Sequence, residues 1–124
     1  MNFKIDTKEV FHVIIIEEKD LSANMAAELE NFIAVEQQKN QLSLILNFKN
    51  VAQIDPVFLN LFLKLKSTLS NQQKSFVVCE LSSDLQKQLG MDKEFEGFHL
   101  TPTESEAWDI VQMEEIEREL GLDI

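Results

Sequence analysis

The sequence has 124 residues, 44% of them hydrophobic, and its 22 acidic against 11 basic residues give a formal net charge of −11. This length fits one domain and the apolar content can fill one core, so residues 1–124 are expected to form a single domain. The acidic balance repels phosphate groups, which argues against nucleic acid as a partner and favours a partner with a basic surface.

The cysteine content and the N-terminus indicate the compartment. The single cysteine, Cys79, lies in an apolar run at residues 76–81, where a buried thiol in a reducing environment is expected. The first residues lack the apolar core of a secretory signal. The longest wholly apolar run near them, residues 13–16, is too short to cross a bilayer. We therefore expect a cytoplasmic protein without a membrane span.

The chain begins with a predicted β-hairpin. Residues 3–6 alternate between apolar and polar side chains, as in a half-exposed strand. Residues 10–16 are mostly β-branched, which is typical of a strand covered on both faces. The three residues between these strands are enough for a tight connection, so this first pair is expected to be antiparallel.

A helix is predicted to begin within residues 20–24, where Ser22 or Asn24 can cap it, and to end near residues 39–41. Residues 42–48 follow as a buried strand. Side chains that recur at helical spacing define one face of the helix: Met25, Leu29, Phe32, Ile33 and Glu36.

The second predicted helix has the clearest start in the sequence, Asp55-Pro56. Proline favours an extended conformation for the residue before it, as an N-cap requires, and its own φ suits the first helical position. Residues 76–81 are then expected to form a buried strand. The predicted core stripe of the helix consists of Phe58, Phe62, Leu65 and Leu69, with Leu61 beside it.

The remaining elements are short until the last helix. Residues 82–84 are expected to cap a helix that ends near Leu89, with Gly90 as its terminator. Residues 98–100 read as a minimal strand. Thr103 and Glu106 then form a capping-box pattern before a helix that extends to about residue 120. The predicted α/β order is β-β-α-β-α-β-α-β-α, with a mostly parallel sheet and an antiparallel N-terminal edge strand.

This order resembles the STAS domain, the family of anti-sigma-factor antagonists and sulphate-transporter tails. Residues 18–24 resemble the acidic turn before its first helix. The strand and loop that lead to its signature turn are resembled by residues 44–48 with Val51 and Ile54-Asp55. Residues 100–107 resemble the entry to its last helix. The resemblance implies the STAS fold, with helices packed against the sheet, and a regulatory function.

The signature turn departs from the family pattern. In phosphorylatable members the turn reads Asp-Ser-Ser/Thr-Gly, and a partner kinase modifies the first serine. Here it reads Asp55-Pro56-Val57-Phe58, and the next hydroxyl along the chain belongs to Ser67. Since proline has no hydroxyl, a phosphorylation switch at this turn is chemically excluded.

The resemblance implies a partner-binding surface around two turns. Its expected residues are Asp20, Ser22, Asn24, Asp55, Pro56, Val57, Leu59, Asn60 and Leu63. Asp55 has a structural interpretation as well, an N-cap that contributes about 1 kcal/mol. Leu59 and Leu63 lie roughly 100–140° from the core stripe, so they either pack against a neighbouring helix or form an exposed patch.

The last helix has a second apolar stripe. Trp108, Ile110 and Val111 are expected to face inward, whereas a narrow stripe lies among glutamates further along. We expect this stripe to dock onto the edge of the domain; association with another helix is the alternative. The stripe consists of Met113, Ile116 and Leu120.

Nothing in the sequence predicts an enzyme. His12 and His99 have no second ligand at metal spacing, so structural or solvated roles are expected for both. The sequence has no glycine-rich phosphate loop, no Cys/His cluster and no nucleophile paired with a base. We therefore expect no catalysis, no metal and no cofactor.

Three functions remain. The first is a STAS-type regulatory module that binds an anti-sigma factor or a related histidine-kinase-like ATPase. The second is an accessory subunit of an ABC-type lipid transporter, bound to the ATPase subunit. The third is a small-ligand carrier with an apolar cavity between the second helix and the sheet. A homodimer is left open in all three.

Overall fold

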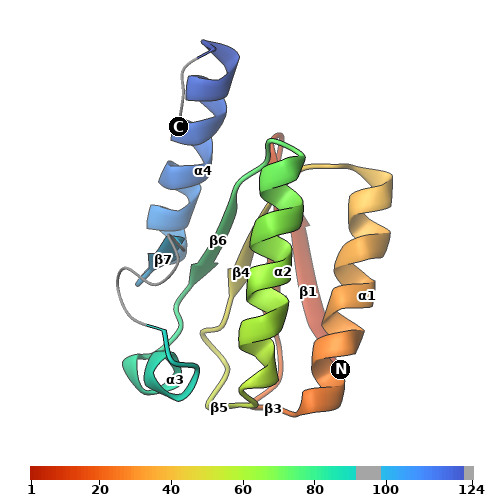
Figure 1. Ribbon diagram of the computed structural model, residues 1–124, viewed down its shortest axis with the longest axis vertical. Coiled ribbons are helices and arrows are strands. Elements are labelled where there is room, and N and C mark those ends of the chain that lie inside the picture. The colour runs from red at the N-terminus through yellow and green to blue at the C-terminus, as the bar shows by residue number, and fades with distance from the viewer. Residues whose placement is uncertain (92–98, 122–124) are drawn as a thin grey trace.

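The computed structural model describes residues 1–91 and 99–121, and its centre is a five-stranded sheet in the order β1-β2-β4-β6-β7 (Figure 1). Strand β1 pairs with β2 in the antiparallel direction, and the other neighbours are parallel. The predicted α/β class and element order are confirmed. The strands are β1 (Phe3–Thr7), β2 (Phe11–Ile16), β4 (Ser43–Asn47), β6 (Phe76–Cys79) and β7 (His99–Thr101).

Helices cover both faces of this sheet (Figure 1). On one face lie α1 (Ala23–Lys39), α2 (Val57–Asn71) and the short α3 (Ser83–Gln88); on the other lies α4 (Glu104–Glu119). A separate two-stranded pair, β3 (Asp20–Leu21) with β5 (Gln53–Ile54), had not been predicted. The last strand, expected at residues 98–100, is described as His99–Thr101, and Phe98 lies outside the described residues.

The central strands divide their side chains between two cores, because successive residues of a strand point to opposite faces. In β2, Ile14 and Ile16 face the core under α1 and α2, whereas Phe11 and Val13 face the core under α4. Strands β4 and β6 follow the same alternation. The prediction that residues 10–16 form a strand covered on both faces is confirmed for residues 11–16.

Aromatic side chains of α2 fill the larger core. Phe62 is fully buried, and its ring centroid lies 5.4 Å from that of Phe48, 6.5 Å from that of Phe58 and 6.4 Å from that of Phe76. The predicted core stripe of this helix is confirmed, since all five of its side chains are at most 7% exposed. Within the described residues, these rings fill the interface between α2 and the sheet where a small-ligand carrier was expected to have its cavity.

His12 joins the hairpin to the end of α1. Its ring is buried, with Nδ1 2.9 Å from the hydroxyl of Thr7 and Nε2 2.9 Å from the carbonyl oxygen of Asn40. Because a carbonyl oxygen only accepts, Nε2 carries a proton and donates it to Asn40. The structural role predicted for this histidine is confirmed.

The first half of α4 is anchored by apolar contacts. Ala107 and Val111 are fully buried, and Trp108 and Ile110 pack beside them. Thr103 caps the helix, since its hydroxyl oxygen accepts a hydrogen bond from the backbone N–H of Glu106 at 3.2 Å. The predicted inward face and the predicted N-cap are both confirmed.

The second half of α4 is anchored by polar groups instead. The Glu114 carboxylate lies 2.9 Å from Nε2 of His99 and accepts the hydroxyl of Ser75. Arg118 donates to the same hydroxyl at 2.8 Å and to Glu115 at 3.4 Å. The bond from Glu114 raises the pKa of His99, and the bond from His99 lowers the pKa of Glu114. These groups hold the helix against β7 and the start of β6.

The stripe of Met113, Ile116 and Leu120 does not dock onto the domain. These three side chains are 59%, 57% and 69% exposed, so the expectation of an intramolecular contact is wrong. The reason is the rotation of the helix about its axis. Ala107 and Val111 fix that rotation, and it turns Glu114 and Arg118 inward in the following turns.

Phe62→Ala tests the larger core. The substitution removes a fully buried ring from an aromatic cluster, and we expect it to lower the free energy of unfolding by about 3–5 kcal/mol, measured by urea denaturation. Ser67→Ala, at an exposed position of the same helix, is the control and should change it by less than about 0.5 kcal/mol. A loss below about 1 kcal/mol for Phe62→Ala would show that the core is not packed around this ring.

His99→Gln tests the polar anchor of α4. The raised pKa of His99 means that its stabilising contribution is complete below the ordinary value of 6.5 and is lost as the pH rises through the folded value. The lowered pKa of Glu114 means that its contribution is present above 4.5 and is lost as the pH falls further. The pair is therefore most stabilising between these values.

We expect the difference in unfolding free energy between wild type and His99→Gln to be larger at pH 5.5 than at pH 8.5. Since the His99 side chain is 42% exposed, the change should stay under about 1 kcal/mol. Asp109→Asn, on the exposed side of α4, should differ from wild type equally at both pH values. A difference for His99→Gln that is equal or larger at pH 8.5 would contradict the pairing.

Candidate functional site

The two turns of the expected partner surface are joined by the β3–β5 pair. Asp20 pairs with Gln53 and Leu21 with Ile54 in a parallel register, and the N–H of Asp55 donates to the carbonyl oxygen of Leu21 at 2.9 Å. The apolar member of each strand, Leu21 or Ile54, is buried. The turn before α1 and the turn before α2 therefore lie side by side, beyond the carboxyl ends of the parallel strands (Figure 1).

Asp55 is the N-cap of α2. Its Oδ1 accepts a hydrogen bond from the N–H of Val57 at 2.9 Å. Pro56 has φ −57° and ψ −18°, so it already has helical geometry although the regular helix begins at Val57. The structural interpretation of Asp55 is confirmed. The side chain stays half-buried at the surface and keeps a second carboxylate oxygen beyond the cap.

Ser22 occupies the N-cap position of α1, but its side chain makes no capping hydrogen bond. Its backbone is extended, with φ −84° and ψ 167°, and its carbonyl oxygen accepts the N–H of Met25 at 3.1 Å. The prediction that a side chain of Ser22 or Asn24 caps the helix therefore fails at Ser22, because the main chain closes this turn. The hydroxyl group is exposed and accessible to another molecule.

For Leu59 and Leu63, packing against a neighbouring helix and forming an exposed patch were the two alternatives, and the structure shows an intermediate arrangement. Both are half-buried and pack against the larger core, so neither forms a fully exposed patch. We use the name turn surface for the expected residues as the structure arranges them. Its exposed members are Asp20, Ser22, Asn24, Pro56 and Asn60, and its half-buried members are Asp55, Val57, Leu59 and Leu63.

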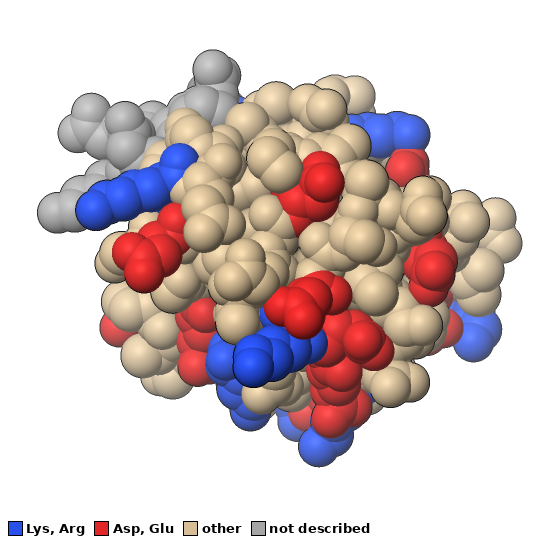
Figure 2. Space-filling view, turned by 90° about the horizontal axis from the view of Figure 1, so that it is seen from below, with Lys and Arg blue, Asp and Glu red and all other residues tan. Residues whose placement is uncertain are grey.

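Figure 2 shows the molecule from the end at which the turn surface lies. Uncharged side chains occupy much of this face, and acidic and basic side chains interrupt them. A face of this composition suits a protein partner with apolar and basic groups better than it suits an anionic polymer.

A buried polar cluster that the sequence did not reveal lies nearby, at the ends of β4 and β6. The amide of Asn47 donates to Glu80 at 3.1 Å and to Glu104 at 2.9 Å, and its own oxygen accepts the N–H of Lys49 at 2.8 Å. Trp108 donates to the other oxygen of Glu104 at 3.1 Å. Glu80 and Glu104 are 33 and 57 residues from Asn47 in the chain, so local spacing gave no signal for these two contacts.

The polar cluster around Asn47 has a structural role and gives no reactive nucleophile. Burial, followed by the charges of Glu104 and Glu80, raises the pKa of the Cys79 thiol to about 12. The thiol is therefore neutral near pH 7 and a poor nucleophile, as expected for a buried cysteine. Within residues 1–91 and 99–121, no group of three or more His, Cys, Asp or Glu side chains is arranged to hold a metal ion.

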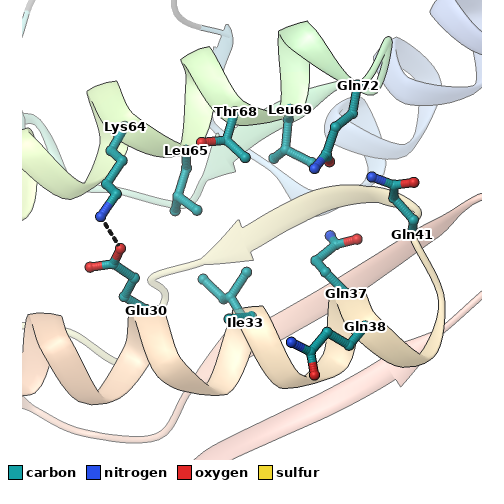
Figure 3. Close-up of a pocket in the computed structure, with 11 residues that line it drawn as sticks. Glu30, Ile33, Gln37, Gln38, Gln41, Lys64, Leu65, Thr68, Leu69 and Gln72 are labelled. Atoms are coloured by element: carbon teal, nitrogen blue, oxygen red, sulfur yellow. Dashed lines mark ion pairs between the residues drawn. The ribbon is translucent and has the colours of Figure 1, made fainter.

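A groove of about 570 Å³ lies between α1 and α2 (Figure 3). Glutamine side chains surround it, and Glu30 and Lys64 form an ion pair at one end. Its apolar floor, however, consists of Ile33, Leu65 and Leu69, which are only 2–7% exposed. The groove thus offers a polar rim over a closed floor, and it differs in place from the cavity expected between α2 and the sheet.

Sequence comparisons find no counterpart: neither a family model nor a curated protein matches the chain. No helix in the described part of the chain is long and apolar enough to cross a membrane.

Comparison of structures does find counterparts. The unphosphorylated anti-sigma factor antagonist SpoIIAA superposes with a TM-score of 0.73 at 18% identity, over 90% of this chain and 97% of that one. An anti-sigma-factor antagonist (STAS) domain protein from Planctomyces limnophilus gives 0.71 at 17% identity, over 88% and 96%. The murine Solute Carrier 26 family member A9 anion transporter gives 0.67 at 15% identity, over 83% of this chain but 18% of that chain.

The similarity covers 88–90% of this chain. At these identities it concerns the backbone arrangement, which agrees with the resemblance inferred from the sequence. The chain has the fold of the STAS domains of anti-sigma factor antagonists.

Proposed function

We propose that this chain is a non-enzymatic regulatory module that binds a protein partner through the turn surface. The observation that supports the proposal most directly is the β3–β5 pair, which holds two exposed turns together on a rigid sheet. Structures with the same fold include anti-sigma factor antagonists and the stressosome, described as a signal integration and transduction hub. Binding surfaces formed by loops on a rigid scaffold are common in proteins.

The partner we propose is an anti-sigma factor or a related histidine-kinase-like ATPase. The turn surface combines exposed polar groups at Ser22, Asn24 and Asn60 with half-buried leucines, a composition typical of a regulated and reversible interface. Since Pro56 replaces the acceptor serine, phosphorylation at this turn cannot control the complex. The complex is then constitutive or controlled at another site.

A transporter subunit is the second candidate, because the same fold occurs within the murine anion transporter. In that case the turn surface would contact the ATPase subunit of an ABC-type lipid transporter. The two candidates predict different proteins in the same experiment. Mass spectrometry of the material that co-purifies with the chain from its native cells separates them.

Asn60→Lys tests the surface. Asn60 is exposed at the start of α2, and a long charged side chain there should reduce recovery of the partner from native cells at least tenfold, through steric and electrostatic conflict. Ser70→Lys places the same change at the exposed far end of the same helix and should leave recovery unchanged. Equal recovery with wild type and both variants would exclude the turn surface as the binding site.

Asp55 allows the cap and the binding role to be separated. Asp55→Asn keeps an oxygen that accepts the N–H of Val57, so stability should change by less than about 0.5 kcal/mol. Asp55→Ala removes the cap and should cost about 1 kcal/mol in thermal or urea unfolding. If the carboxylate also contacts the partner, both variants weaken binding. Binding by Asp55→Asn equal to wild type would restrict the residue to capping.

A further inference from the structure

The last helix reverses its amphipathic orientation halfway along its length. In the first half, Ala107 and Val111 face the sheet, while Glu106 and Asp109 face outward and are exposed. In the second half the inward positions belong to polar residues, and the outward positions belong to Met113, Ile116 and Leu120, which we call the outer stripe. In this second half, polar side chains thus face the domain and apolar side chains face water.

Helix geometry places these groups on opposite sides. At about 100° per residue, the outer stripe spans an arc of roughly 60°, and its centre lies roughly 180° from the direction of Ala107 and Val111. Figure 1 shows the end of α4 extending beyond the sheet. The outer stripe therefore points away from the domain, and the described residues offer it no surface to pack against.

The polar anchor, formed by Glu114, Arg118, Ser75 and His99, holds the helix in this orientation. Glu114 is bonded to Ser75 and His99, and Arg118 is bonded to Ser75, so rotating the helix to bury the outer stripe would break these bonds. The same rotation would also turn Ala107 and Val111, both fully buried, away from the core beneath them. The anchor presents the outer stripe as a fixed feature of the folded protein.

The charges around the outer stripe define the chemistry of what covers it. Glu106 and Asp109 share its exposed side one to two turns earlier, and Glu119 borders it. The whole chain carries a net charge of −11. A helix with an apolar stripe and lysine or arginine flanks would bury the stripe and pair with these carboxylates.

A second copy of this chain fits less well. Two outer stripes packed together would bring the carboxylates beside each stripe close to those of the other copy, and two chains of charge −11 repel each other. The groove between α1 and α2 is a weaker apolar site, because its floor is at most 7% exposed whereas the outer stripe is 57–69% exposed.

We propose that the outer stripe is a second protein-binding surface, separate from the turn surface, and that its occupant is a basic amphipathic helix of a partner protein. Met113, Ile116 and Leu120 supply the apolar contact. The basic helix is oriented, and its association accelerated, by charge attraction to Glu106, Asp109 and Glu119. The proposal does not depend on the proposed function of the turn surface.

The test uses the full chain and three synthetic 18-residue helical peptides, measured by fluorescence anisotropy at two salt concentrations. The first peptide has a leucine stripe with lysine flanks, the second has the same stripe with glutamate flanks, and the third has lysine flanks with glutamine in place of leucine. We expect the leucine–lysine peptide to bind at least tenfold more tightly than either of the others, and more weakly at higher salt.

Variants of the chain assign this binding to the surface. The triple variant Met113→Gln, Ile116→Gln, Leu120→Gln should weaken binding of the leucine–lysine peptide at least tenfold, with the helix retained because glutamine is a good helix former. Val35→Gln is the matched control, since Val35 is an apolar residue of α1 that is 50% exposed, and it should bind as wild type does. Asn60→Lys should also leave peptide binding unchanged.

Any of the following results would overturn the proposal. One is unchanged binding of the leucine–lysine peptide by the triple variant, which would indicate non-specific attraction to an acidic protein. Another is equal binding of the glutamate-flanked peptide or no binding of any peptide. The third is a dimer of the wild type in sedimentation that the triple variant lacks, which would make a second copy the occupant.

Discussion

The three central parallel strands have apolar side chains on both faces, so the sheet has to be covered twice. Helices α1 and α2 cover one face and α4 covers the other, and the two cores share the same strands. At the carboxyl end of the strands lies the turn surface, and beyond the other end α4 extends past the sheet (Figure 1).

The two surfaces are built by different kinds of interaction. The turn surface depends on main-chain bonds of a two-residue strand pair, which hold the two turns side by side above the buried side chains of Leu21 and Ile54. The orientation of the outer stripe depends on side chains, because hydrogen bonds of Glu114 and Arg118 with Ser75 and His99 hold the rotation of the helix about its axis. Substitutions at the exposed positions of the turns therefore leave the main-chain pairing in place, whereas substitutions in the anchor of α4 remove the bonds that orient the helix.

Local signals in the sequence were enough for much of this structure. The Asp55-Pro56 start of α2, the Thr103 cap and the alternation of the hairpin depend on neighbouring residues, and each was predicted. The β3–β5 pair was missed because two residues show no periodicity. The outer stripe was predicted to dock because the pattern alone cannot reveal that contacts of Val111 set the rotation of the helix. The missed strand pair and the wrong prediction for the outer stripe both concern contacts between distant parts of the chain.

The order of the strands has a consequence for how the protein is made. In the main sheet, β1, β2, β4, β6 and β7 lie side by side in the same order in which they occur in the chain. Each new strand is therefore added at the edge of those already paired, and none has to be inserted between two partners. The sheet can grow on the ribosome as synthesis proceeds, and α4 closes the second face only when the rest is complete.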